Sequence, residues 1–426
     1  MNSWFGNALT RAEAIDDWLH EKRAASLALL RDTDWPTRQT EAWKYTSLKK
    51  LEQLDFSDGS PAPVIDVSPI SGLNSINLVF IDGVLQSIPA DLPEGLTIMP
   101  LAQVPDEHQP WVLDQFAGVK PQQHLFGLIN DTLATNGLVI DVAPQVDLKH
   151  PIHITQTMTA GNEAHCRTLV RVGAGARVTV IEHLAGNQES FNTSFTEYSL
   201  ATKAELEHYR LALQSDAALT IGGSHFNLDT QATLNSTIVG YGSDLARIDV
   251  DISHQGEGTL AKLDAIYLLD KQTHFDLHSN IEHTAPNGTS DERVRGIVAD
   301  KARAVFNGRI HIHRYAQKTS AELNNRNLLL SRDAEVDVKP ELEIYADDVS
   351  CAHGATIAEI DQLALYYLRS RGIGLEQAHL MLNFGFINEL IDQIPNAVLA
   401  DWLRQQLSGR FTRMNEIKHS GQEATQ

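Results

Sequence analysis

The spacing of hydrophobic and polar positions changes twice along the chain. Residues 8–32 carry apolar side chains three or four positions apart with few helix breakers, a pattern that predicts helical structure. The segment 34–36, Asp-Trp-Pro, ends this pattern, and a stretch at 57–72 containing proline and serine predicts a linker. The chain therefore opens with a helical region.

Alternating, β-branched segments dominate the middle of the chain. The run at 76–81 precedes Asp82-Gly83, which predicts a strand ending in a turn. Short alternating segments then follow one another from about 137 to about 358. Proline is absent from 152 to 285, so little in that stretch interrupts strand ladders, and all six tryptophans lie outside the β region.

The length of this β region bears on its architecture. An ordinary sandwich rarely runs as long as this region does. A coil of short stacked strands can, because each turn contacts only its neighbours and the stack can lengthen. No strict repeat period is visible in the sequence. The pattern favours a mainly β protein with a β-helix core, and a double-sheet jelly roll is the alternative.

The last part of the chain returns to helical spacing. Residues 360–373, 375–394 and 396–411 each carry the apolar periodicity of a helix, and Gly372 and Gly374 separate the first two. The pattern as a whole predicts three domains: an N-terminal helical and mixed domain (1–115), a β core (116–358) and a C-terminal helical domain (359–426).

Composition and charge restrict the function. The net charge of −21 repels phosphate backbones and anionic lipids, so we expect neither nucleic-acid nor membrane binding. The N-terminal residues lack the apolar core of a signal peptide, and two cysteines in 426 residues do not make a secreted disulfide framework. These features predict a cytoplasmic protein with free thiols.

Cys351 and His353 are the most conspicuous candidate ligands. Residues two apart in a strand share a face, so both side chains point the same way if this segment is extended. Thiolate and imidazole suit iron or zinc, but a closed zinc site or an iron–sulfur cluster usually needs about four protein ligands. On spacing alone, a buried cysteine and a hydrogen-bonded histidine are the favoured interpretation.

Other motifs give little evidence for a catalytic or binding site. The chain has no P-loop, no dinucleotide-binding fingerprint and no G-x-S-x-G elbow. Asp347 and Asp348 face opposite sides of a strand, which makes them poor partners for glycan cleavage. His311 and His313 also lie two apart on a predicted strand, but with 18 histidines such pairs arise by chance, and we interpret them as surface or core residues.

Four segments together resemble a known family. They read PTRQTEAWKYTSL at 36–48, AVFNGRI at 304–310, NRNLLLSRDAEVDVKPELEIYADDVSCAHGATIAEID at 325–361 and YYLRSRGI at 366–373. They resemble the SufB/SufD family of the SUF iron–sulfur cluster assembly system. Within it, the chain is most similar to the SufD branch, because SufB-type chains are longer and richer in cysteine. The second cysteine here, Cys166, then remains a structural thiol.

The resemblance implies a fold, partners and a site. The expected fold is a right-handed parallel β-helix with helical ends, and the expected role is a non-catalytic, cytoplasmic scaffold in a SufBCD complex. A SufB-like paralogue pairs with the end of the β-helix, where His353 contributes a ligand and Cys351 an auxiliary thiol to a transient iron–sulfur cluster. No cofactor is held stably by this chain alone. A SufC-like ABC-type ATPase binds the C-terminal helices, with contacts expected at Tyr367, Arg369, Arg371 and the 375–394 helix.

Two alternatives remain open at this stage. The first is a homodimeric metal-binding protein, in which two Cys351/His353 pairs meet across a two-fold axis and supply four ligands. The second is a β-helix enzyme acting on polysaccharides, although a β region without tryptophan offers few sugar-stacking surfaces.

Overall fold

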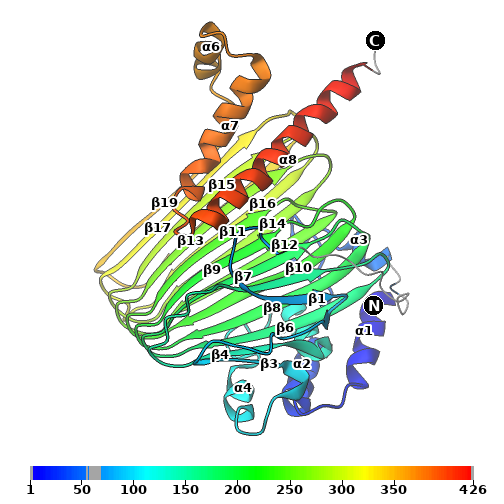
Figure 1. Cartoon of the computed structure of the whole chain (residues 1–426), viewed down its shortest axis with the longest axis vertical. Helices are drawn as coiled ribbons and strands as arrows, with labels where there is room; N and C mark the ends of the chain where they lie inside the picture. Colours follow the sequence, from blue (N-terminus) through cyan, green and yellow to red (C-terminus); the bar gives the residue numbers. More distant parts are fainter. Residues whose placement is uncertain (1–2, 54–55, 57–68, 424–426) are drawn as a thin grey trace.

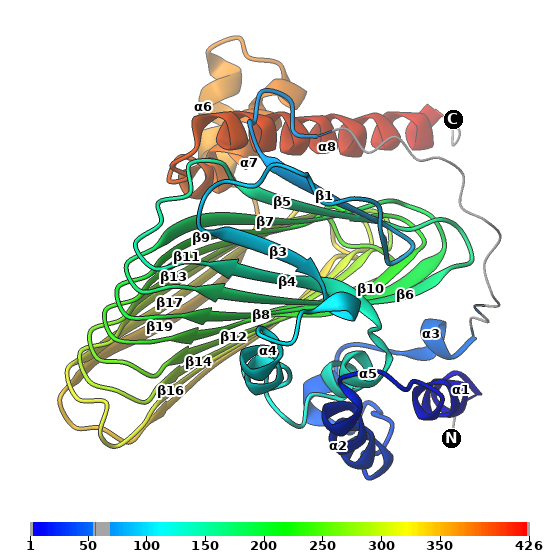
Figure 2. The same ribbon diagram turned by 60° about the horizontal axis from the view of Figure 1, so that its bottom comes forward.

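The computed structural model describes residues 3–53, 56 and 69–423. Most of the linker predicted at 57–72 lies outside these described residues. A coiled β core occupies the middle of the molecule, and the N-terminal and C-terminal helices lie on different sides of it (Figures 1 and 2). None of the helices in the described residues combines the length and apolarity that a membrane span requires.

The predicted helical start folds into two helices. Helix α1 (Ser3–Glu13) and helix α2 (His20–Arg31) are separated at Asp17, whose carboxylate accepts a hydrogen bond from the Leu19 amide at 3.0 Å. A side chain that bonds nearby backbone competes with helix continuation, so the break falls there. The remaining short helices before strand β4 are η1 (Glu41–Trp43), α3 (Lys49–Gln53), η2 (Leu101–Gln103), α4 (Gln109–Gln115) and α5 (Leu125–Leu133).

The core is a parallel β-helix in which each coil gives one strand to each of two sheets. In sequence order, the ten-stranded sheet contains β1 (Ile76–Ile81), β2 (Val84–Leu85), β5 (Ile152–Thr157), β7 (Arg177–Ala185), β9 (Glu205–Ala212), β11 (Thr233–Gly240), β13 (Leu260–Leu269), β15 (Thr289–Val298), β17 (Thr319–Leu329) and β19 (Val349–Ala358). The nine-stranded sheet contains β3 (Leu96–Pro100), β4 (Asn136–Val142), β6 (Glu163–Val172), β8 (Ser190–Leu200), β10 (Ala218–Leu228), β12 (Leu245–His254), β14 (His274–His283), β16 (Arg303–Ile312) and β18 (Glu335–Ile344).

Strand pairing distinguishes this fold from a jelly roll. Successive coils pair in parallel, so Gly222 on β10 lies opposite Ser194 on β8 and Ile248 on β12. Jelly rolls are antiparallel. Among the named strands, only the β1–β2 hairpin and the β3–β4 pair are antiparallel. The β-helix prediction is therefore confirmed, and the jelly-roll alternative is wrong.

Helices cover the outer faces of both sheets. The aromatic side chains of Trp4 and Phe126 pack on Phe191 of β8, so the N-terminal helices lie against the nine-stranded sheet. Strands β1 and β3 fall within the predicted segment 1–115 and pair with the core sheets. The domain boundaries at 115 and 358 stay predictions.

The C-terminal helices lie on the other sheet. They are α6 (Gln362–Ser370), α7 (Leu375–Ile391) and α8 (Ala397–Glu423). Apolar residues of α7 and α8, such as Ile387 and Leu403, pack on outward residues of the ten-stranded sheet, such as Ile266. Figures 1 and 2 show that α6 and the adjoining end of α7 extend beyond the β-helix.

The interior of the β-helix encloses the carboxyl group of Glu292. Glu292 on β15 is fully buried and shares a strand face with Val294, a member of the interior cluster. Burial raises the pKa of Glu292 to about 7. The unfolded chain releases this proton near its ordinary pKa of 4.5, so the folded chain retains it over a wider range. The stability that protonated Glu292 contributes to the wild-type protein is therefore lost as pH rises from about 4.5 through about 7.

Replacing Glu292 with Gln is expected to stabilise the protein at pH 8 and to change little near pH 4. The amide stays neutral, so it avoids the cost of a buried carboxylate, which is of order 3 kcal/mol for this shift. Urea unfolding at both pH values measures the difference, with Glu189→Gln on an exposed turn as the control. Equal stability of wild type and Glu292→Gln at pH 8 would contradict the burial argument.

Candidate functional site

The last coil of the β-helix ends in two open strand edges. Strand β18 is terminal in the nine-stranded sheet and pairs with β16, and β19 is terminal in the ten-stranded sheet and pairs with β17. Most of β19 is exposed and most of β18 is only half-buried, whereas the strands of inner coils are largely buried. Unpaired edge groups are a template for adding strands from another chain. Within the described residues this end of the β-helix has no further coil.

Cys351 and His353 lie on β19 and share a strand face, as the extended-segment prediction requires. Cys351 lies opposite Ala321 and is half-buried, packing with Val349 against the interior cluster. His353 lies opposite Leu323 and is exposed. The arrangement presents one imidazole and one thiol at the open edge, next to any chain that adds to it.

The two cysteines differ in their surroundings. Burial raises the pKa of the Cys351 thiol, which is close to solvent, and metal binding is one way to remove that proton. Cys166 on β6 is fully enclosed, and burial raises its pKa to about 12. A buried, neutral thiol is unreactive, so the structure supports the interpretation of Cys166 as a structural residue.

The second predicted site lies on the projecting helix α6. Asp361 begins this helix by accepting hydrogen bonds from the Leu363 and Ala364 amides at 2.8 and 3.2 Å. At its other end, the Arg371 guanidinium lies 5.2 Å from the Tyr367 ring centre and donates to Tyr367 Oη at 3.2 Å.

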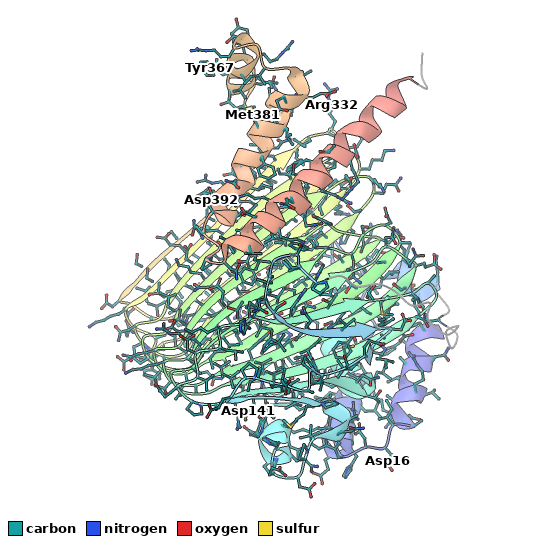
Figure 3. The ribbon with its side chains drawn as sticks, viewed as in Figure 1. Asp16, Asp141, Arg332, Tyr367, Met381 and Asp392 are labelled. Carbon is teal, nitrogen blue, oxygen red and sulfur yellow. The ribbon has the colours of Figure 1, made fainter. Side chains whose placement is uncertain are left out.

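The predicted contact residues are all exposed: Tyr367 and Arg369 lie on this helix, and Arg371 directly follows it. Tyr367 and Met381 mark the part of α6 and α7 that stands clear of the β-helix (Figure 3). The structure thus brings these three residues together at one projecting element, which follows the strand that carries Cys351.

Two apolar residues beside them were missed from the sequence. Leu363 and Tyr366 are 76% and 71% exposed, and with Tyr367 they form a stripe at i, i+3 and i+4 of α6. That spacing normally marks a buried helix face. The periodicity was visible in the sequence, but the direction in which the stripe faces depends on the projection of α6 away from the core. We call Leu363, Tyr366 and Tyr367 the α6 stripe.

The fold and the two sites together define a class of protein: a β-helix with a thiol and an imidazole at its open end and a projecting helix with an exposed apolar stripe. Comparison with known families agrees. The family model described as "SUF system FeS cluster assembly, SufBD core domain" matches residues 154–386. The chain belongs to this SufBD family.

Relatives extend the match over nearly the whole chain. The iron–sulfur cluster assembly protein SufD of Escherichia coli is 32% identical over 94% of this chain and 96% of its own length. A SufBD family protein of Synechocystis is 31% identical over 93% of this chain and 92% of its own length. The chloroplastic protein ABCI7 of Arabidopsis thaliana is 29% identical over 94% and 90%. The resemblance drawn from the four sequence segments is therefore confirmed.

Proposed function

We propose that this chain is a non-catalytic scaffold subunit of a SufBCD-type complex that assembles iron–sulfur clusters. The observation that carries the proposal is the open last coil, which places Cys351 and His353 on an unpaired strand edge. A SufB-like paralogue would add to this edge and supply the ligands that one strand lacks. The cluster is then the cargo of the interface, and this chain alone does not hold that cluster stably.

The α6 stripe supports a second contact. Contiguous exposed apolar residues on a projecting helix mark a protein-interaction surface, and Arg369 and Arg371 border this one with positive charge. We propose that a SufC-like ABC-type ATPase docks here, because the sequence itself contains no P-loop to supply ATP hydrolysis.

The test is an anoxic pull-down of the tagged chain from lysate of its own cells, with co-eluting proteins identified by mass. Recovery of a P-loop ATPase together with a larger, cysteine-richer relative supports the scaffold assignment. Recovery of the chain as a metal-containing dimer of itself supports the homodimeric alternative. A chain that elutes as a metal-free monomer contradicts both.

Charging the α6 stripe is expected to release the ATPase without releasing the SufB-like partner. Leu363→Asp combined with Tyr366→Asp places two carboxylates in an apolar contact, and the same pull-down should lose the ATPase by at least about tenfold. Charge reversal of Arg369 and Arg371 to Glu tests the polar border of the same surface.

Leu29→Asp is the matched control, since Leu29 is an exposed apolar residue on α2, among the N-terminal helices. Unchanged ATPase recovery with the α6 variants would move the docking surface elsewhere.

A further inference from the structure

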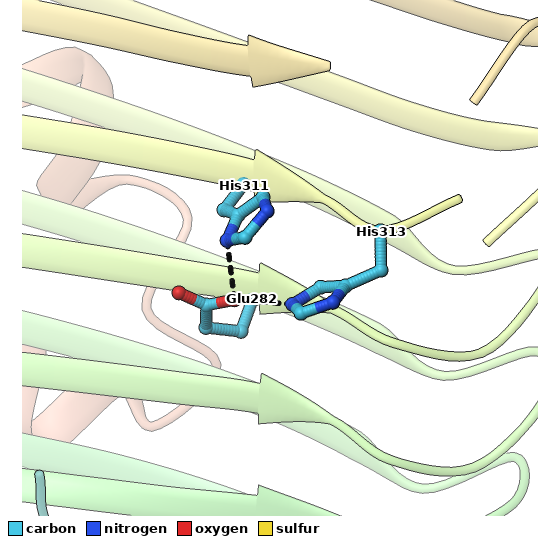
Figure 4. A group of neighbouring side chains, drawn as sticks. All are labelled: Glu282, His311 and His313. Carbon is cyan, nitrogen blue, oxygen red and sulfur yellow. Dashed lines mark hydrogen bonds and ion pairs between the residues drawn. The ribbon is translucent and has the colours of Figure 1, made fainter. Parts of the chain in front are cut away.

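Two histidines and a glutamate converge on the outer face of the nine-stranded sheet. Glu282 Oε2 lies 2.9 Å from His311 Nδ1 and 2.6 Å from His313 Nε2 (Figure 4). These three atoms all lie within 4.8 Å of one another, and within the described residues they form the single group of three or more such side chains with that spacing. Two imidazoles directed at one carboxylate oxygen are the donor set of many zinc and iron(II) sites.

The strands fix this geometry. Glu282 on β14 lies directly opposite His311 on β16, so the two side chains leave adjacent strands in register. Ile281 and Ile310 beside them point inward to the core, which anchors the backbone on both strands. His313 follows β16 directly, and its ring stacks on His311 with centres 4.1 Å apart. Sites built on strands hold their ligands more accurately than sites built on loops.

Arg309 contacts the ring nitrogen of His311 that lies nearest to Glu282. Arg309 Nη2 lies 2.9 Å from His311 Nδ1, and a guanidinium only donates hydrogen bonds. An Nδ1 atom that accepts this hydrogen bond carries no proton, and it lies 2.9 Å from Glu282 Oε2. Neutral imidazole is the form that binds metal ions, and a metal ion at Nδ1 would replace the hydrogen bond from Arg309.

Neighbouring residues orient the carboxylate. Arg309 Nη1 donates to Glu282 Oε1 at 2.6 Å, which leaves Oε2 for the two histidines. Arg309 also donates to both oxygens of Glu343, at 2.8 and 3.0 Å. Burial raises the pKa of Glu282, but the hydrogen bonds from His313 and Arg309 outweigh it and hold the pKa below its ordinary value. Hydrogen bonds to a ligating carboxylate are typical of metal sites.

We propose that Glu282, His311 and His313 bind a divalent transition metal ion of the zinc or iron(II) class. The ligand atoms need to move apart to about 3.3 Å, the edge of a tetrahedron with bonds of about 2.0 Å. His313 is 42% exposed, which lets such a shift occur and leaves a fourth position for water. The site is separate from Cys351 and His353 and does not depend on the proposed scaffold function.

Cobalt(II) is the probe that distinguishes this site from the strand-edge pair. The purified full-length chain is titrated with Co²⁺ and then with competing Zn²⁺, and bound metal is counted after equilibrium dialysis. We expect one equivalent bound, with visible absorption from nitrogen and oxygen ligands and without a thiolate-to-metal charge-transfer band. His313→Ala and Glu282→Gln should each weaken binding at least about tenfold.

Two histidine variants serve as matched controls. His150→Ala removes an exposed histidine elsewhere, and His353→Ala removes the strand-edge imidazole; both should bind like wild type. Thermal unfolding followed by circular dichroism confirms that every variant is folded. Affinity unchanged in His313→Ala and Glu282→Gln, or absence of stoichiometric binding by wild type, overturns the proposal. Loss of the site through His353→Ala or a thiolate band would assign the metal to the strand edge instead.

Discussion

Replacing His353 with Ala is expected to abolish cluster assembly while the chain stays folded. His353 is exposed on β19, so its loss removes little packing. As a ligand it would be harder to replace than a supporting residue, whose loss already costs about 10–100-fold in metal affinity. Anoxic reconstitution of the complex with iron and a sulfur donor, followed by measurement of bound iron and sulfide, gives the result.

Variants at the neighbouring positions Cys351 and Ala352 serve as comparisons for His353→Ala. Cys351→Ser is expected to reduce assembly less, because the proposal gives that thiol an auxiliary role. Ala352→Ser changes the residue between them, which faces the other side of the strand, and should leave assembly intact. Normal assembly by a folded His353→Ala chain would remove His353 from the site.

The fold was predictable because alternation and length are properties of the sequence. The repeat was not visible because the coils differ in length. Leu219 pairs with Leu245, whereas Arg303 pairs with Glu335, so the later coil takes up a longer piece of chain than the earlier one. Variable turns hide a period that the parallel register makes obvious. The coiled architecture therefore followed from length and family resemblance rather than from periodicity.

Whether a site could be predicted from the sequence depended on whether its residues lie in one segment or in different coils. Cys351 and His353 are neighbours in sequence, so strand geometry alone placed them on one face. Glu282 and His311 belong to different coils, and only the pairing of β14 with β16 brings them together. No spacing rule within one segment reveals such a site, which is why His311 and His313 were interpreted as ordinary histidines.

The second large effect is expected at the open edge of β19. Ile357 is 46% exposed on this strand, opposite Asn327 of β17. If a SufB-like partner continues the sheet here, Ile357→Lys places an ammonium group in the contact. Charged edge residues, lysine above all, are a common device for preventing strand addition. We expect affinity for the partner to fall at least about tenfold, or about 1.4 kcal/mol, measured by titration calorimetry with the purified partner.

The other end of the same sheet provides a control of equal chemistry. Val84 lies on β2, the strand farthest from β19 in the ten-stranded sheet, and is 54% exposed. Val84→Lys adds the same charge to a comparable exposed strand residue and should leave the affinity unchanged. An equal loss in both variants would mean that net charge, rather than the edge, governs association. Unchanged affinity in Ile357→Lys would place the partner away from β19, and Cys351 and His353 would then lack the neighbouring chain that completes their site.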